Sequence, residues 1–202
     1  MNKKFFEKNT LDAARELLGK VLCVKSDGKV HRGIIVETEA YTQEDPACHA
    51  YCGMRISADA ERPSVSKTAL LRTADNPRRT KRSQTLFEKP GTIYVYLIYG
   101  MHYCVNIVTE KEGYGAAVLI RALEPLENLA NTNGPAKLCK AANITKEFNG
   151  AYIFDKNSPI WLEDGEQIPD AKVVQTTRIG IKKAADYKWR FYIKDNEWVS
   201  KL

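Results

Sequence analysis

The sequence predicts an α+β fold, a single domain in which a mostly antiparallel, curved sheet or open barrel is flanked by short helices. The chain has 202 residues and 44% hydrophobic content, which is enough to bury one core. Stretches with strand composition follow one another through short glycine-containing turns, whereas helical patterns are few and short. We therefore expect one domain over residues 1–202, with a basic loop at about 53–89.

The first elements in order are a short amphipathic helix and a β-hairpin. The helix is expected over residues 10–19, with Asn9 or Thr10 as its cap. An alternating strand follows, and Asp27-Gly28 has the composition of a two-residue hairpin turn. The chain should therefore return antiparallel in a strand over residues 33–41.

The returning strand carries two carboxylates on one face. Strict alternation places Ile35, Glu37, Glu39 and Tyr41 together. Glu37 and Glu39 would lie about 6.6 Å apart along the strand, which is close enough for one charge to raise the pKa of the other. The more enclosed carboxylate is then a candidate general base. Two ordinary glutamates on a solvent-facing strand edge would give the same pattern.

A basic segment follows this strand. Residues 42–90 show little periodicity, with a helical signal only around 64–72. Residues 62–89 hold eight basic side chains against two acidic ones, which equals the whole formal net charge of +6. Such a cluster favours a phosphate backbone as partner, because neutralised phosphates release counterions. A solvated basic loop is the alternative interpretation.

Three consecutive strands after the Pro90-Gly91 turn predict a meander: residues 92–99, 103–109 and 116–123. In the first of them Tyr94 and Tyr96 share a face, whereas Tyr99 lies on the other face or at the turn made by Gly100.

The remaining part of the chain predicts one more helix and further strands. Residues 134–141 have proline at a typical first helical position, and Lys137 near that amino end could meet a phosphate. Residues 151–202 alternate weakly and are expected to form closing strands that complete the core.

The composition argues against several classes of protein. No apolar run reaches the roughly 18 residues of a membrane span, and the amino end lacks the apolar segment of a secretory signal, so we expect a cytosolic protein with no membrane partner. Five scattered cysteines predict free thiols, and no glycine-rich phosphate loop suggests a cofactor. Cys48, His49 and Cys52 invite a metal interpretation, but no second Cys/His pair follows at ligand spacing, so no metal is expected.

Five blocks stand in a distinctive order: VETEAY at 36–41, ACH at 47–49, PGTIYVYLIYGM at 90–101 with Asn106, VLIRALEP at 118–125 and GPAKL at 134–138. Together they strongly resemble the 3-methyladenine (alkyladenine) DNA glycosylases, and residues 178–180, 190–192 and 198–200 are similar to that family's carboxy end. The sequence departs from the family pattern at Ser83, where asparagine is usual, and in extra residues between 53 and 80.

The resemblance implies a monofunctional glycosylase that flips alkylated or deaminated purines out of duplex DNA and hydrolyses the N-glycosidic bond. It implies that Glu39 is the general base for the attacking water and that Arg121 helps to hold this water. Tyr41, His49 and Tyr96 match the residues that enclose the flipped base, whose positive charge favours stacking on an electron-rich ring. Such a reaction leaves an abasic site without breaking the strand.

The resemblance also assigns contacts with the rest of the duplex. Asn106 matches the residue held to clash with the amino group of normal guanine, and Tyr99 matches the wedge inserted into the gap in the duplex. Further DNA contacts are expected at four residues: Arg82, Met101, His102 and Lys137.

The expected partner is therefore double-stranded DNA with damaged purines, bound by a monomer in the cytoplasm, at the nucleoid in a bacterium. Two alternatives remain at this stage. A non-catalytic nucleic-acid binding module could retain the same tyrosines and basic loop. Metal-dependent hydrolysis through Cys48, His49 and Cys52 would require a bound zinc ion.

Overall fold

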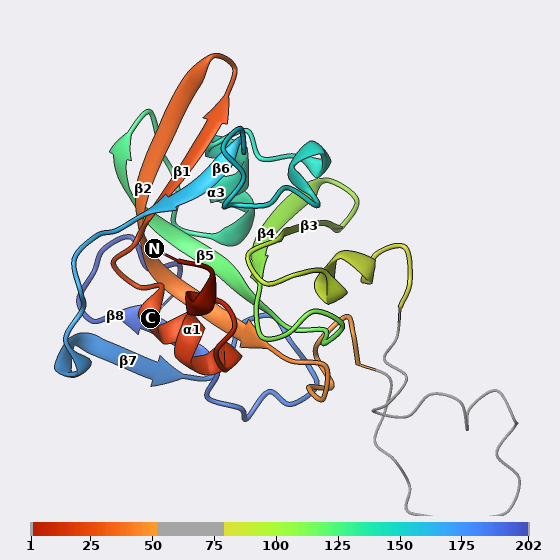
Figure 1. Cartoon of the computed structure of the whole chain (residues 1–202). Helices are drawn as coiled ribbons and strands as arrows, with labels where there is room; N and C mark the ends of the chain where they lie inside the picture. Colours follow the sequence, from red (N-terminus) through yellow and green to blue (C-terminus); the bar gives the residue numbers. More distant parts are fainter. Residues whose placement is uncertain (1, 52–78, 202) are drawn as a thin grey trace, which may run out of the picture.

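The computed structural model describes residues 2–51 and 79–201, and within them the chain forms a curled antiparallel sheet with short helices (Figure 1). The helices are α1 (Thr10–Glu16) and α3 (Pro135–Ala141), with short 3₁₀ turns that include η2 (Gln84–Phe87). The strands are β1 (Val21–Ser26), β2 (Lys29–Tyr41), β3 (Ile93–Ile98), β4 (His102–Val108), β5 (Ala117–Glu127), β6 (Ile160–Glu163), β7 (Val173–Thr176) and β8 (Arg190–Ile193). The α+β prediction is confirmed.

Strand β2 lies in the middle of this sheet. The strand order is β3-β4-β5-β2-β1-β6, and β8 pairs with both β2 and β7. Along β2, residues 32–41 pair with β5, residues 29–34 with β1 and residues 37–39 with β8, all antiparallel. Glu37 and Glu39 consequently have 0% exposure. The solvent-facing strand edge considered above is wrong, because neighbouring strands cover this part of β2.

A β-bulge in β2 changes which side chains share a face. Ile35 pairs with Leu123 of β5, but Glu37 pairs with Ala122, so β2 carries one extra residue between them. Ile35 and Ala40 both pack in the main apolar cluster, whereas strict alternation places them on opposite faces. The bulge therefore removes Ile35 from the face of the two glutamates and leaves the carboxylates together.

The elements around the first hairpin agree with the sequence patterns except at one helix end. The turn residues Asp27 and Gly28 both have positive φ, at 48° and 73°, as expected for a two-residue hairpin turn. The Asn9 side chain caps α1 by accepting a 2.9 Å hydrogen bond from the N–H of Leu11. The helix ends at Glu16, earlier than predicted, and residues 17–19 form a turn.

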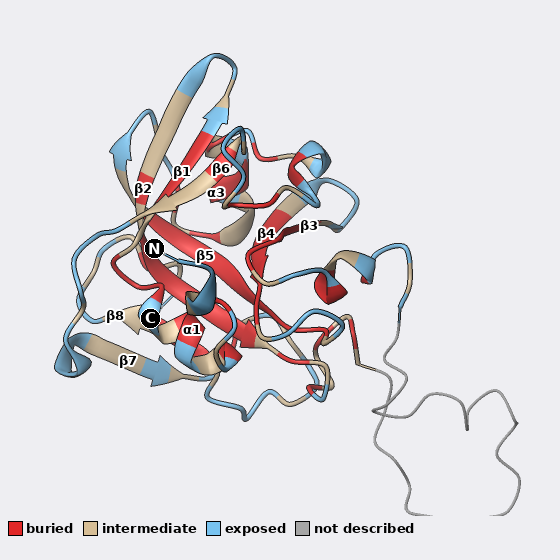
Figure 2. Ribbon diagram, viewed as in Figure 1, coloured by how far each residue is buried: buried red, intermediate tan, exposed pale blue. Residues whose placement is uncertain are grey.

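Figure 2 shows the buried residues in red, concentrated in the middle of the sheet. Their apolar members form two clusters. The larger cluster lies between the sheet and the helices α1 and α3. The smaller one, here called the pocket cluster, consists of Cys48, Ala50, Leu86, Phe87, Tyr94, Val108 and Ala117. Tyr41 and Tyr96 pack against the pocket cluster, which therefore supports one wall of the candidate site.

The meander prediction is confirmed, because β3, β4 and β5 are adjacent in the sheet and in the chain. The carboxy part contributes β6, β7 and β8, as expected for closing strands. The helical signal around residues 64–72 and most of the basic loop lie outside the described residues. In the part of the chain that the structure does describe, every helix falls short of the length and apolarity needed to cross a membrane.

Candidate active site

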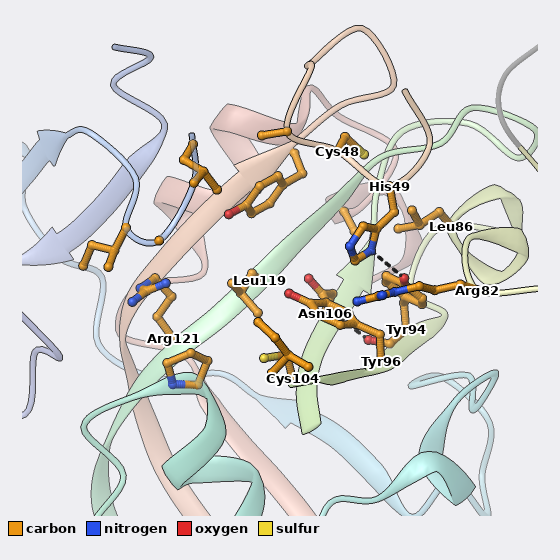
Figure 3. Close-up of a pocket in the computed structure, with 18 of the residues that line it drawn as sticks. Cys48, His49, Arg82, Leu86, Tyr94, Tyr96, Cys104, Asn106, Leu119 and Arg121 are labelled. Carbon is orange, nitrogen blue, oxygen red and sulfur yellow. Dashed lines mark hydrogen bonds between the residues drawn. The ribbon is translucent and has the colours of Figure 1, made fainter. Parts of the chain in front are cut away.

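A cavity of about 330 Å³ opens beside the central strands (Figure 3). Seven of the residues predicted to act in a site line it: Tyr41, His49, Arg82, Tyr96, Tyr99, Asn106 and Arg121. Arg82 and Arg121 lie at opposite sides of the cavity, with the rings of His49 and Tyr96 nearer to Arg82. Met101, His102 and Lys137 do not line it, and all three are exposed.

The Glu39 carboxylate lies behind the cavity wall, bonded to three of the residues that line it. Its Oε1 accepts a 2.7 Å hydrogen bond from the backbone N–H of Ile179. Its Oε2 accepts a 2.7 Å hydrogen bond from the Tyr41 hydroxyl and lies 3.2 Å from a guanidinium nitrogen of Arg121. The arrangement joins the central strands β2 and β5 to the loop after β7 at one carboxylate.

Burial is the main influence on the pKa of this carboxylate. Desolvation raises the pKa of Glu39, while Arg121, the Ile179 N–H and the Tyr41 hydroxyl lower it and Glu37 raises it further. The net pKa lies above the ordinary value. Burial and the Glu39 charge hold the pKa of Tyr41 well above its ordinary value, so this phenol stays a hydrogen-bond donor.

Glu37 belongs to a buried charge network that shares Arg121 with Glu39. Its Oε1 lies 3.0 Å from Nε of Arg121 and 2.8 Å from a guanidinium nitrogen of Arg190. Its Oε2 accepts a 2.7 Å hydrogen bond from the backbone N–H of Ser200. Glu37 is fully buried, so its carboxylate offers no exposed surface for DNA, and its role in this structure is to balance buried charge.

Aromatic rings make the opposite part of the cavity. The rings of His49 and Tyr96 meet edge to face with centroids 4.7 Å apart, and Tyr94 lies 5.5 Å from Tyr96. Nδ1 of His49 lies 2.8 Å from the Tyr94 hydroxyl, so that two ring systems are fixed together. Tyr94 is buried in the pocket cluster and also lines the cavity, so it contributes both to packing and to the cavity wall. His49 does reach the cavity.

Asn106 is buried on β4 next to these rings. Its side-chain amide donates a 3.0 Å hydrogen bond to the backbone carbonyl of Tyr94. This bond fixes the orientation of the Asn106 side-chain amide, which lines the cavity.

The turn between β3 and β4 presents Tyr99 to solvent. Its side chain is 81% exposed, and its φ of 53° is unusual for a bulky residue. Leu97 and Met101 on either side are also exposed large apolar residues, with Met101 at 70%. An exposed apolar tip beside a cavity is the kind of surface that marks an interaction site.

The Cys48-His49-Cys52 group is only partly within the described residues, since Cys52 lies outside them. Cys48 is buried, and desolvation raises the pKa of its thiol to about 12.

The sequence patterns left three functional neighbours unassigned. The N–H of Ile179 bonds Glu39, and the next residue back, Arg178, forms a buried ion pair with Asp45. The block at 178–180 was visible in the sequence, but Arg178 and Asp45 are 133 positions apart, and no sequence pattern indicated their pairing.

Known proteins match nearly the whole length of this chain. The family model for the methylpurine-DNA glycosylases (MPG) matches residues 4–60 and 73–197. A relative in Francisella tularensis subsp. tularensis (strain WY96-3418) is 43% identical, with 95% of this chain and 94% of the relative covered. Relatives in Salinibacter ruber (40%; 97% and 94% covered) and Clostridium botulinum (38%; 100% and 98% covered) are also similar. All three carry the name "Putative 3-methyladenine DNA glycosylase".

Fold, site and matches together define a DNA glycosylase, a hydrolase acting on N-glycosyl bonds. The family model covers most of the chain in two segments. The chain belongs to the methylpurine-DNA glycosylase family.

Proposed function

We propose that this protein flips alkylated or deaminated purines, 3-methyladenine among them, out of duplex DNA and hydrolyses the N-glycosidic bond with an activated water. The observation that carries the proposal is the buried Glu39 carboxylate, which lies 3.2 Å from Arg121 at the wall of an aromatic cavity. The reaction needs a base for water and an enclosed pocket for a purine, and Glu39 and this cavity would serve these two roles.

Glu39 would act as the general base. A carboxylate offers about four acceptor positions, and the bonds from Ile179, Tyr41 and Arg121 occupy three of them. The remaining position suits one water, whose proton Glu39 would accept as the oxygen attacks C1′ of the sugar. Arg121, which also lines the cavity, would help to hold this water.

The cavity suits a purine that carries positive charge. Tyr41, His49 and Tyr96 would enclose the flipped base, and tyrosine ring faces attract cations. An alkylated purine leaves the sugar without prior protonation, so one base in an enclosed pocket would be sufficient. Asn106, whose amide is fixed by the Tyr94 carbonyl, would clash with the amino group of normal guanine.

The exposed turn would hold the duplex open. Tyr99 would enter the gap left by the flipped nucleotide, because it is exposed beside the cavity and lies at a strand end. Met101 and His102 next to it would touch the duplex, while Arg82 and Lys137 would meet phosphates. One lesion needs one such site, so we propose that a monomer acts, in the cytoplasm where its DNA is.

The test uses duplex oligonucleotides with single lesions, 3-methyladenine or hypoxanthine, followed by heating in alkali to convert abasic sites into nicks. Glu39→Gln should abolish nicking and keep DNA binding, because the amide cannot accept the proton of water. Glu127→Gln on the exposed end of β5 is the matched control and should retain activity.

Nicks before the alkali step would contradict a monofunctional reaction. Equal activity in Glu39→Gln would remove Glu39 from its role. Salt-sensitive DNA binding with no base release by the unmodified protein would favour the non-catalytic binding module instead.

A further inference from the structure

A buried ion pair next to the cavity takes no part in the chemistry described so far. The guanidinium of Arg178 and the carboxylate of Asp45 are both fully buried, and they form two hydrogen bonds, one of them 3.0 Å long. Neither residue lines the cavity. The pair nevertheless lies directly behind its wall, because the Arg178 guanidinium carbon is 4.6 Å from the centre of the Tyr41 ring.

Arg178 fastens three segments that are far apart in the sequence. One guanidinium nitrogen donates a 2.9 Å hydrogen bond to the carbonyl of Ala40, at the end of β2 and directly before Tyr41. Asp45 lies in the loop that leads to His49. Arg178 itself directly precedes Ile179, whose N–H bonds the Glu39 carboxylate.

Asp45 also makes hydrogen bonds within its own loop. Its carboxylate accepts a 2.9 Å hydrogen bond from the N–H of Ala47, and its carbonyl accepts one of 2.9 Å from the N–H of Cys48. Arg178 is therefore connected through Asp45 to Cys48, the residue before His49. It is also connected through the backbone to Ile179, the next residue in the chain.

Stability alone gives a poor account of this pair. Two ions taken out of water lose hydration that their attraction barely recovers, and apolar replacements are often equally stable. The arrangement also leaves Nε of Arg178 without a hydrogen-bond partner among the described residues, a further cost. What the pair does provide is fixed geometry, since the planar guanidinium bonds Asp45 with two nitrogens and stacks over Tyr41 and over Trp189, 5.1 Å away.

We propose that Arg178, held by Asp45, is a positioning residue that places the Ile179 amide on the Glu39 carboxylate and the Tyr41 ring against the cavity. This inference rests on the proposed function for its effect on rate. Misplacement of a reacting group by about 1 Å can lower a rate by about 100-fold, so loosening the pair should slow base release even when the protein remains folded.

The experiment separates positioning from stability by comparing a single with a double substitution. Arg178→Met leaves a buried unpaired carboxylate, so it should lower both the resistance to urea and the single-turnover rate of base release. Arg178→Met combined with Asp45→Asn removes both charges and keeps an oxygen for the Ala47 N–H, so resistance to urea should largely return. The rate of the double variant should stay at least about tenfold below that of the unmodified protein, with substrate binding kept.

Leu22→Ala serves as a control that loses stability far from the cavity, because Leu22 is buried in the larger cluster on β1. It should lower the resistance to urea and leave the single-turnover rate within about twofold. A double variant whose rate returns along with its stability would overturn the proposal and make the pair structural only.

A second measurement does not need enzymatic activity. Hydrogen exchange of the Ile179 amide should be at least about tenfold faster in the double variant, because its bond to Glu39 loosens while the fold persists. Unchanged exchange would overturn the positioning role, even if the rate falls. If the unmodified protein releases no base from any lesion, the proposed function fails, and the amide exchange still decides whether Arg178 positions Ile179.

Discussion

The backbone N–H of Ser200 donates a 2.7 Å hydrogen bond to Oε2 of Glu37, so a segment 163 residues further along the chain closes over the central strand. The other oxygen of the same carboxylate bonds Arg121 and Arg190. Glu37 therefore balances two buried guanidinium groups, one of which also contacts Glu39. The two neighbouring glutamates have different surroundings, because Glu37 compensates buried charge, whereas Glu39 lies behind the cavity wall in contact with residues that line the cavity.

Substitution of Glu37 should lower the free energy of unfolding. Glu37→Gln leaves Arg190 without a carboxylate partner and Arg121 with Glu39 alone among the described residues. Loss of one partner from a buried ion pair costs about 3–5 kcal/mol, so the free energy of unfolding in urea should fall by about that amount. Glu124→Gln is the matched control, since Glu124 accepts from the neutral Asn196 amide and is only half-buried, and it should cost less than about 1 kcal/mol. An equally small effect of Glu37→Gln would contradict the assignment.

Local features of the fold could be read from the sequence because short-range physics decides them. Asp27-Gly28 predicted a hairpin turn, and both residues have the positive φ that a two-residue hairpin turn requires. Asn9 capped the helix as expected. The bulge that separates Ile35 from Glu37 was missed, because alternation alone carries no mark of an extra residue.

The candidate site likewise combines features that the sequence predicts with features that only the folded chain creates. Spacing predicted that Glu37 and Glu39 share a face, but both are fully buried in a part of β2 that pairs with β5 and β8, and no local pattern gives those neighbours. The residues Tyr41, His49, Asn106 and Arg121 were identified through family resemblance, and the fold gathers them around one cavity. The ion pair between Arg178 and Asp45 could not be predicted from the sequence, because neither residue lies in a motif that fixes its distance from the other.

The raised pKa of Glu39 should appear in the pH dependence of stability. Its folded-state pKa lies above the unfolded value because of burial, so the native state binds more protons than the unfolded state between the two pKa values. Stability should therefore fall as pH rises through that window, and the loss is complete above the folded pKa. Urea unfolding from about pH 4 to 7 should show Glu39→Gln gaining stability relative to the unmodified protein as pH rises. A constant difference across this range would contradict the raised pKa.

Activity should respond to the same group in the opposite sense. A general base works only when ionised, so single-turnover base release should decrease as pH falls through the raised pKa of Glu39. The midpoint of this acid limb should lie above the ordinary value of 4.5 for a glutamate. Hypoxanthine DNA is the substrate for this measurement, because neutral hypoxanthine leaves the sugar spontaneously more slowly than a cationic alkylated purine does. Glu127→Gln is again the control variant. An acid limb centred below 4.5 would assign the base to another group.

Substitution of Tyr99 should separate stability from function. The side chain is 81% exposed and its φ is 53°, so Tyr99→Gly removes an unfavourable backbone conformation at little cost in burial. We expect the free energy of unfolding to stay constant or to rise by about 1 kcal/mol, while base release from duplex DNA falls at least about tenfold. Asp195→Gly, at a φ of 59° on an exposed turn outside the cavity lining, should match the stability effect and keep activity. Full activity of Tyr99→Gly would rule out the wedge.

Arg82 should contribute to DNA binding through its charge. Its guanidinium lies at the cavity rim, 5.1 Å from the centre of the Tyr96 ring and 3.2 Å from the carbonyl of Leu97, and the residue is exposed. If Arg82 meets one phosphate, Arg82→Gln should reduce the slope of log binding constant against log salt by about 0.9, whatever the lesion, because one fewer counterion is released. Lys25→Gln removes an equal charge from an exposed position on β1 that does not line the cavity, and it should leave the slope unchanged. Equal slopes for all three proteins, measured by fluorescence anisotropy between about 50 and 200 mM salt, would place Arg82 away from the backbone and leave its stacking on Tyr96 as its contribution to the rim.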